Sequence, residues 1–322
     1  MLLNDFTTYQ GHNCILGNVY NTMKYYHLNV SEQDLFFWFS PFDGSKTLPE
    51  VFDKLYEDKG KLGWQEFMQK SLNDAKPVMI SINPKSLPYI INTVSDSLTN
   101  HYINIIGSDE NTKQIYVSDC YVPTFIPSTY EGWIDFRGIS DSDIGNCWCL
   151  NPEPFSYLRN NNVCSDIKDY TLVSVIKRLC SFLNKNSDNK KNTGIDNLQN
   201  LSKTVRNCIE NGNYHKIYKL LAGIRLNIIN PLIYLVNLFE YYPNKYGKWI
   251  ELLNNLITRH WEPINVKLIK FALAHKKMDL DKISEQIDNA VKLEKNALND
   301  LLNWMYETEF NRIIEITKSL AL

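Results

Sequence analysis

Apolar side chains near the N-terminus fall at the spacing of a helix. Between residues 13 and 27 they occupy one face, at Ile15, Leu16, Val19, Tyr20, Met23 and Tyr26. Since residues three and four apart share a helix face, this pattern predicts a helix with one buried side and with Cys14 in its first turn. Helices are also predicted over Ser31–Phe39, where a short polar start leads into an aromatic run, over Leu48–Asp58 and over Trp64–Asn73.

Strand-like runs follow. They are Pro77–Ile82, His101–Gly107 and Gln114–Asp119, and Cys147–Leu150 reads as a closing strand. The polar segment Asp109–Lys113 predicts a hairpin connection between the second and third runs. Helices that precede an antiparallel sheet are the pattern of an α+β fold.

Beyond residue 165 only helical patterns continue. Residues 169–184 are amphipathic, 184–194 form a polar loop without an apolar residue, and an apolar stripe runs through 281–322. Helix breaks are expected near Asn211-Gly212-Asn213, Pro231, Pro243 and Pro263. The sequence therefore predicts two domains, an α+β domain over residues 1–164 and an all-helical domain over 165–322.

The charge along the chain is uneven. The 322 residues carry a formal charge of −2, with 44% hydrophobic and 12% aromatic residues, as in a globular protein with a full core. This balance argues against a nucleic-acid partner. Lys and Arg number 11 against 19 Asp and Glu in residues 1–164, and 11 against 5 in 165–225. The basic stretch is either a set of solvated helix faces or a surface for an acidic partner.

No secretory signal opens the chain and its apolar runs are short, so we expect no membrane partner and a cytoplasmic location. Seven cysteines in such a protein are expected to be reduced thiols. Cys120, Cys147 and Cys149 lack partners at zinc-ligand spacing and are expected in the core. We expect neither a metal nor a bound cofactor, and without a glycine-rich phosphate loop we expect no ATP-dependent ligation.

The string from Tyr9 to Asn18 holds the main candidate for chemistry. A thiol at a helix N-terminus lies at the positive end of the helix dipole, which favours the nucleophilic thiolate. A backbone N–H there, with a nearby amide, can hold an oxyanion, and Gln10 and Asn13 supply candidate amides. His12 is a candidate for substrate contact or for capping the helix. Taken alone, Cys14 also fits a small core residue.

His101 and Asp119 give Cys14 possible partners. His101 opens one strand and Asp119 closes the next, so the hairpin predicts that the two lie across from each other. A carboxylate beside an imidazole fixes the tautomer and stabilises the imidazolium. Asp109 is the rival carboxylate, but its place in a polar turn favours a turn function. The order Cys, His, Asp is that of papain-type enzymes.

These motifs resemble a known superfamily. Gly11-His12-Asn13-Cys14 before a helix, Asn100-His101-Tyr102-Ile103 opening a strand and Tyr116-Val117-Ser118-Asp119 resemble the papain-like leader peptidases of bacteriocin exporters. Within that superfamily the start is more similar to the butirosin-biosynthesis H protein family and the related closthioamide amide synthase. The resemblance covers residues 5–125 and implies a papain-like catalytic domain.

The resemblance also implies a reaction. In that family, an acyl or peptidyl carrier protein, carrying its thioester on phosphopantetheine, acylates the cysteine, and a small-molecule or peptidyl amine then takes the acyl group as an amide, in nonribosomal or other natural-product biosynthesis. By this comparison Cys14 is the nucleophile, His101 the base and Asp119 the residue that orients the base. The helical domain and its basic stretch would suit an acidic carrier protein.

Two departures and two alternatives stay open. Leader peptidases place an oxyanion glutamine further ahead of the cysteine and follow the cysteine with glycine, whereas Gln10 is four positions ahead and Ile15 follows. A cysteine hydrolase, either a leader peptidase or a thioesterase, would use the same three residues with water as acceptor. A binding module that keeps the fold without the reaction is the third class.

Overall fold

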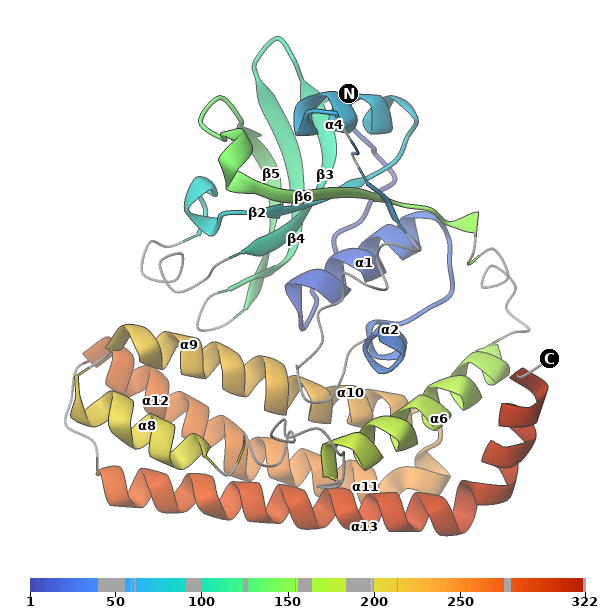
Figure 1. Cartoon of the computed structure of the whole chain (residues 1–322), viewed down its shortest axis with the longest axis vertical. Coiled ribbons are helices and arrows are strands. Elements are labelled where there is room, and N and C mark those ends of the chain that lie inside the picture. The colour runs from blue at the N-terminus through green and yellow to red at the C-terminus, as the bar shows by residue number, and fades with distance from the viewer. Residues whose placement is uncertain are drawn as a thin grey trace. The chain divides into compact units, whose positions relative to one another are not determined.

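A computed structural model describes residues 1–39, 56–58, 60, 62–90, 100–123, 127–153, 155, 164–183, 198, 200–212, 214–274 and 279–320. The chain divides into two compact units (Figure 1). The first holds the antiparallel sheet and its helices up to Val163, and the second holds the helices from Cys164 onward together with Phe36–Phe39 of helix α2. The α+β class predicted from the sequence is confirmed.

The sheet of the first unit has six strands, and every neighbouring pair is antiparallel. Their order across the sheet is β1-β6-β2-β3-β4-β5. Their bounds are Tyr56–Asp58 for β1, Val78–Ile82 for β2, His101–Asp109 for β3, Gln114–Val122 for β4, Ser128–Asp135 for β5 and Ile144–Leu150 for β6. All four predicted strands are present, and so is the predicted hairpin between β3 and β4.

The two strands that the sequence pattern missed, β1 and β5, are the two edges of the sheet. Strand β5 is mostly exposed and has no apolar run, because ladder hydrogen bonds to β4 hold it rather than burial on both faces. The helix predicted over Leu48–Asp58 is wrong at its end, where Tyr56–Asp58 pair with β6 as a strand. The rest of that prediction lies outside the described residues, as does the predicted loop 184–194.

In the part of the chain that the structure describes, three helices accompany the sheet: α1 (Cys14–Tyr25), α2 (Glu32–Phe39) and α4 (Trp64–Asn73). They agree with the predicted helices. Short 3₁₀ turns η1 (Pro84–Ser86) and η2 (Asp141–Asp143) lie in the connections.

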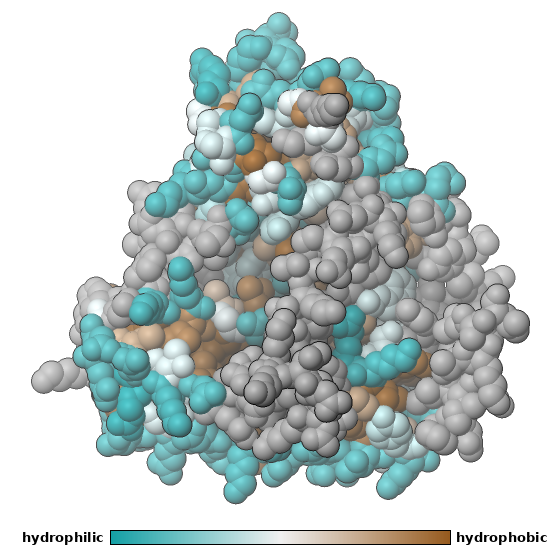
Figure 2. All heavy atoms as spheres, in the orientation of Figure 1, coloured by the Kyte–Doolittle hydropathy of each residue, from teal (hydrophilic) through white to brown (hydrophobic). Residues whose placement is uncertain are grey.

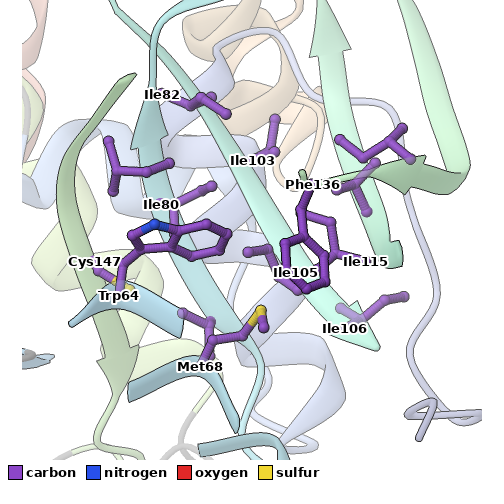
Figure 3. Packing of buried hydrophobic residues seen from close by; sticks show 14 of the residues in the cluster. Trp64, Met68, Ile80, Ile82, Ile103, Ile105, Ile106, Ile115, Phe136 and Cys147 are labelled. Atoms are coloured by element: carbon purple, nitrogen blue, oxygen red, sulfur yellow. The ribbon is translucent and has the colours of Figure 1, made fainter. Parts of the chain in front are cut away.

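Helices α1 and α4 cover opposite faces of the sheet. Trp64 and Met68 of α4 pack in one cluster with Ile103 and Ile105 of β3 (Figure 3). Asn104, the residue between those two isoleucines, instead donates a hydrogen bond to the backbone of α1. Because successive strand side chains point to opposite faces, the core cluster holds one face of β3 and α1 holds the other.

The second unit is helical, as predicted. Its helices are α6 (Cys164–Leu183), α8 (Leu201–Glu210), α9 (Tyr214–Ile224), α10 (Asn230–Phe239), α11 (Pro243–Asn255), α12 (Glu262–Ala274) and α13 (Leu280–Leu320). The predicted apolar stripe on α13 is buried, from Ile283 and Ile287 to Leu298, Leu301 and Met305. Helix α13 runs along one border of this unit in Figure 1, and the same border is largely hydrophilic in Figure 2.

Two predicted helix breaks are wrong, and both are explained by π-helical turns. A π-helical stretch, η5 (Arg225–Ile229), joins α9 to α10 just before Pro231, and η6 (Leu256–Trp261) joins α11 to α12 just before Pro263. A proline cannot donate to the carbonyl four residues back and its ring crowds that carbonyl. The wider π-turn relieves this conflict. Pro243 and the Asn211–Asn213 segment do separate helices, as expected.

The segment Lys219–Phe239 is long and apolar enough by length and composition to cross a membrane, although the sequence predicted no such stretch. Slightly more than half of its most apolar window is buried within the protein. Leu232, Leu235 and Phe239 are fully enclosed. That burial is compatible with a core helix of a soluble protein.

Candidate active site

Cys14 is the first residue of α1, and Asn13 caps that helix. The Asn13 side-chain Oδ1 accepts hydrogen bonds from the backbone N–H groups of Ile15 at 2.8 Å and Leu16 at 3.2 Å. These are two of the donors that a helix start leaves without an intrahelical acceptor. Cys14 itself is partly exposed, so its thiol stands at an open helix N-terminus.

A buried carboxylate holds the turn that leads into Cys14. Glu32 of α2, only 7% exposed, accepts the backbone N–H groups of His12 and Asn13 at 3.0 to 3.2 Å. These N–H groups are therefore used to shape the turn. This role of Glu32 was not predicted from the sequence, because the two segments become neighbours only in the fold.

His101 and Asp119 form a buried pair. The distance from His101 Nε2 to Asp119 Oδ2 is 2.7 Å, and the two residues are 1% and 0% exposed. The register Asn104↔Ser118, continued by one residue, sets Asp119 opposite Ile103 and hence diagonal to His101. The predicted neighbourhood is thus present, although Asp119 lies within β4, which runs on to Val122, rather than at its end.

Asp119 has further donors. The Tyr89 hydroxyl donates to Oδ2 at 3.1 Å, and the backbone N–H of Tyr121 donates to Oδ1 at 3.0 Å. The Tyr89 ring stacks on Tyr130 with 3.8 Å between the ring centroids. Three donors around one carboxylate satisfy its ionised form. Tyr89 was not recognised from the sequence, since nothing in its local pattern links it to Asp119.

The imidazole of His101 is held in its charged form. Burial alone lowers the pKa of His101, but the charge and hydrogen bond of Asp119, followed by the hydrogen bond and charge of Cys14, raise it to about 10. Because Nε2 is taken by Asp119, Nδ1 is the ring nitrogen left for the Cys14 thiol. The fold thus brings Cys14, His101 and Asp119 together in one hydrogen-bonded series.

Close packing under the start of α1 involves a second cysteine. The Cys120 Sγ lies 3.8 Å from the carbonyl oxygens of Asn13 and Cys14. A Cβ placed on Gly17 would stand 2.6 Å from this sulfur, so only glycine fits there. Burial raises the pKa of Cys120 well above its ordinary value, with smaller contributions from neighbouring acidic groups. Cys120 is accordingly a neutral packing thiol, the core role that the sequence predicted.

The candidate oxyanion residues differ in what their side chains do. Gln10 is exposed and its Nε2 donates to the Pro127 carbonyl at 2.9 Å. Asn13 uses Oδ1 for the cap, which turns Nδ2 away from the helix N–H groups. Among the described residues, neither Asn13 Nδ2 nor the Cys14 backbone N–H has a hydrogen-bond acceptor. His12 is partly buried beside the Glu32 carboxylate, in the turn ahead of Cys14.

The remaining candidates have structural roles. Asp109 accepts the backbone N–H groups of Asn111 and Thr112 in the β3–β4 turn, as expected. Cys147 and Cys149 are fully buried in the core cluster.

No known protein-family model matches this chain, and no curated protein matches it. Its function is therefore inferred from the site itself.

Proposed function

We propose that this protein is a papain-like cysteine acyltransferase, in which Cys14 accepts an acyl group from a carrier-protein thioester and passes it to an amine. The observation that carries the proposal is the series Cys14–His101–Asp119, in which the buried carboxylate holds the imidazole charged beside a thiol at a helix N-terminus. That arrangement suits a thiolate–imidazolium pair, the resting form of an activated cysteine.

The reaction divides into two steps. The Cys14 thiolate attacks the thioester carbonyl carbon, the carbon–sulfur bond to the phosphopantetheine breaks, and the departing thiolate takes the Nδ1 proton of His101. An amine then attacks the Cys14 acyl thioester, neutral His101 accepts the amine proton, and the Cys14 thiolate leaves. An amide has formed, the imidazolium is restored and no external energy source is consumed.

Asn13 and Cys14 are the proposed oxyanion donors. In each step negative charge develops on the carbonyl oxygen, and donors fixed in advance stabilise it. The Asn13 amide is locked by its two cap bonds. Its Nδ2 and the Cys14 backbone N–H are donors at the start of α1 that have no acceptor among the described residues. Gln10 is assigned to holding the Pro127 carbonyl instead.

Amine transfer is proposed over hydrolysis on the resemblance of the Cys14, His101 and Asp119 motifs to the butirosin-biosynthesis H protein family. Free thiols are present at Cys14, Cys120, Cys147, Cys149, Cys180 and Cys208, which suits the proposed cytoplasmic location. We propose the helical unit as the part that receives the carrier protein, since α9 has two lysines and no acidic residue.

The test is intact-mass spectrometry after mixing the protein with an acyl-phosphopantetheinyl carrier protein. We expect one acyl adduct, absent in Cys14→Ala and retained in Cys180→Ala, which removes a partly exposed thiol elsewhere. Added amines should discharge the adduct as amide. Discharge by water alone, with every amine tried, would identify a hydrolase. An adduct that persists in Cys14→Ala would contradict the proposal.

A further inference from the structure

A buried asparagine joins the backbone of the proposed nucleophile to the backbone beside the proposed base. Asn18 lies one helical turn after Cys14 and is 0% exposed. Its Nδ2 donates to the Cys14 carbonyl oxygen at 2.6 Å and to the Tyr102 carbonyl oxygen at 2.7 Å. Tyr102 directly follows His101. One amide group therefore spans from the first residue of α1 to the second residue of β3.

The surroundings of Asn18 show that this connection has an energetic cost. Its Oδ1 is buried and has no hydrogen-bond partner among the described residues, and the same holds for Oδ1 of Asn104. The Asn104 Nδ2 donates to the Asn18 carbonyl at 3.0 Å. A buried polar atom left unpaired costs about 1–3 kcal/mol. An apolar residue of the same size would avoid that cost but would leave the Tyr102 carbonyl without this donor.

We infer that Asn18 is a positioning residue, which fixes the spacing between Cys14 and His101. The inference rests on the proposed function, because that spacing matters only if the two side chains act together. Both Nδ2 hydrogens are used by the two carbonyls, so Asn18 does not contact the reacting atoms. Its contribution is to hold α1 and β3 at the separation that the thiolate–imidazolium pair needs. Small misplacements of reacting groups lower rates steeply.

The helix offers a matched control. Asn21 is also fully buried on α1, and its side chain both accepts from and donates to the backbone of Tyr9, at 3.2 and 3.1 Å. It thus joins α1 to the N-terminal segment and not to β3. Substitution of Asn21 tests what the loss of a buried amide on this helix does to stability, without releasing the Cys14–Tyr102 connection.

The experiment measures the rate of Cys14 alkylation by iodoacetamide from pH 5 to 9, quantified on the Cys14 peptide by mass spectrometry. Wild-type protein should react measurably at pH 6, because the Cys14 side chain is hydrogen-bonded to the charged imidazole of His101. Asn18→Leu should lower the melting temperature, because it leaves the Tyr102 carbonyl without this donor. It should react about tenfold or more slowly at pH 6. Asn21→Leu should lower the melting temperature and keep the wild-type pH profile.

A second variant covers the case in which Asn18→Leu does not fold. In Asn18→Ser the hydroxyl has one donor and, in a helix, bonds the carbonyl four residues back, so it leaves Tyr102 unconnected. The same loss of reactivity at pH 6 is expected. A wild-type profile in either folded variant would overturn the inference. A wild-type protein that does not react below pH 7 would instead overturn the ion pair of the proposed function.

Discussion

Asp119 and His101 meet on adjacent strands with 2.7 Å between carboxylate oxygen and ring nitrogen, and both are withdrawn from solvent. Burial by itself would favour neutral imidazole, yet the balance with Asp119 and Cys14 raises the pKa of His101 to about 10. The charge state of the site therefore depends on a carboxylate that does not touch the thiol.

Replacing the Asp119 carboxylate should weaken the effect of His101 on the Cys14 thiol. Asp119→Asn keeps the shape and removes the charge, so the pKa of His101 should fall because burial then dominates. We expect acyl transfer to drop about 10²–10⁴-fold, and iodoacetamide alkylation of Cys14 at pH 6 to drop with it. Alkylation that is unchanged at pH 6 would show that Asp119 does not control the imidazole.

The same pair should make stability depend on pH. Folding raises the pKa of His101, so the His101–Asp119 pair contributes its full stabilisation of the folded protein below about pH 6.5. This stabilisation is lost as the pH rises through about 10. Urea unfolding between pH 6.5 and 10 should therefore show a declining free energy of unfolding. The decline should be on the order of a few kcal/mol, and it should be smaller in Asp119→Asn. An equally steep decline in that variant would assign it to other groups.

Glu294 should make the helical unit sensitive to a lower pH range. Burial raises the pKa of Glu294 to about 8, against a smaller lowering by the Trp261 indole N–H, which donates to its carboxyl at 2.8 Å. The free energy of unfolding should fall between about pH 4.5 and 8. Over this range Glu294 is ionised in the unfolded chain but keeps its proton in the folded protein. Glu294→Gln keeps an acceptor for Trp261. It should stabilise by on the order of 2 kcal/mol at pH 7 and have no effect at pH 4.5. A less stable variant at pH 7 would contradict this.

Gly17 should tolerate no side chain. Gly17→Ala places a Cβ 2.6 Å from the Cys120 sulfur and should destabilise by about 1–3 kcal/mol in urea unfolding. Cys120→Ala should recover part of that loss in the double variant, because the two sites couple through one contact. Gly247→Ala, a helical glycine with open space around it, should instead stabilise by about 0.5–1 kcal/mol. Additive losses in the double variant would mean that the contact is not the cause.

Asn13 should have two separable roles. Asn13→Ser keeps a capping oxygen but removes the amide, so stability should change by less than about 0.5 kcal/mol, while the acyl-transfer rate falls about 10²–10³-fold. Asn13→Ala should lose both. Gln10→Ala should keep nearly the full rate, since that amide is bound to Pro127. If Gln10→Ala is the slower variant in single-turnover acylation, the oxyanion assignment belongs to Gln10.

The sequence predicted those helices and strands whose buried residues recur at the regular spacing of a helix or a strand. Helix α1 with Cys14 in its first turn and the buried strands β2, β3 and β4 have such patterns. The edge strands β1 and β5 do not, because pairing with a neighbour needs no apolar run. The π-turns before Pro231 and Pro263 were also missed, since a proline by itself predicts a break.

For the site, the sequence determined which residue types stood where: a cysteine at a helix start, a histidine opening a strand and an aspartate on the partner strand. Only the tertiary structure decided which groups surround them. Glu32, Tyr89 and Asn18 act through contacts between segments 19 to 84 residues apart, and no local period encodes such pairs. In the unfolded chain, conformational entropy keeps these segments from any fixed separation. Packing of α1 against the sheet brings them together, and that packing determines the charge of His101 and the position of Cys14 beside it.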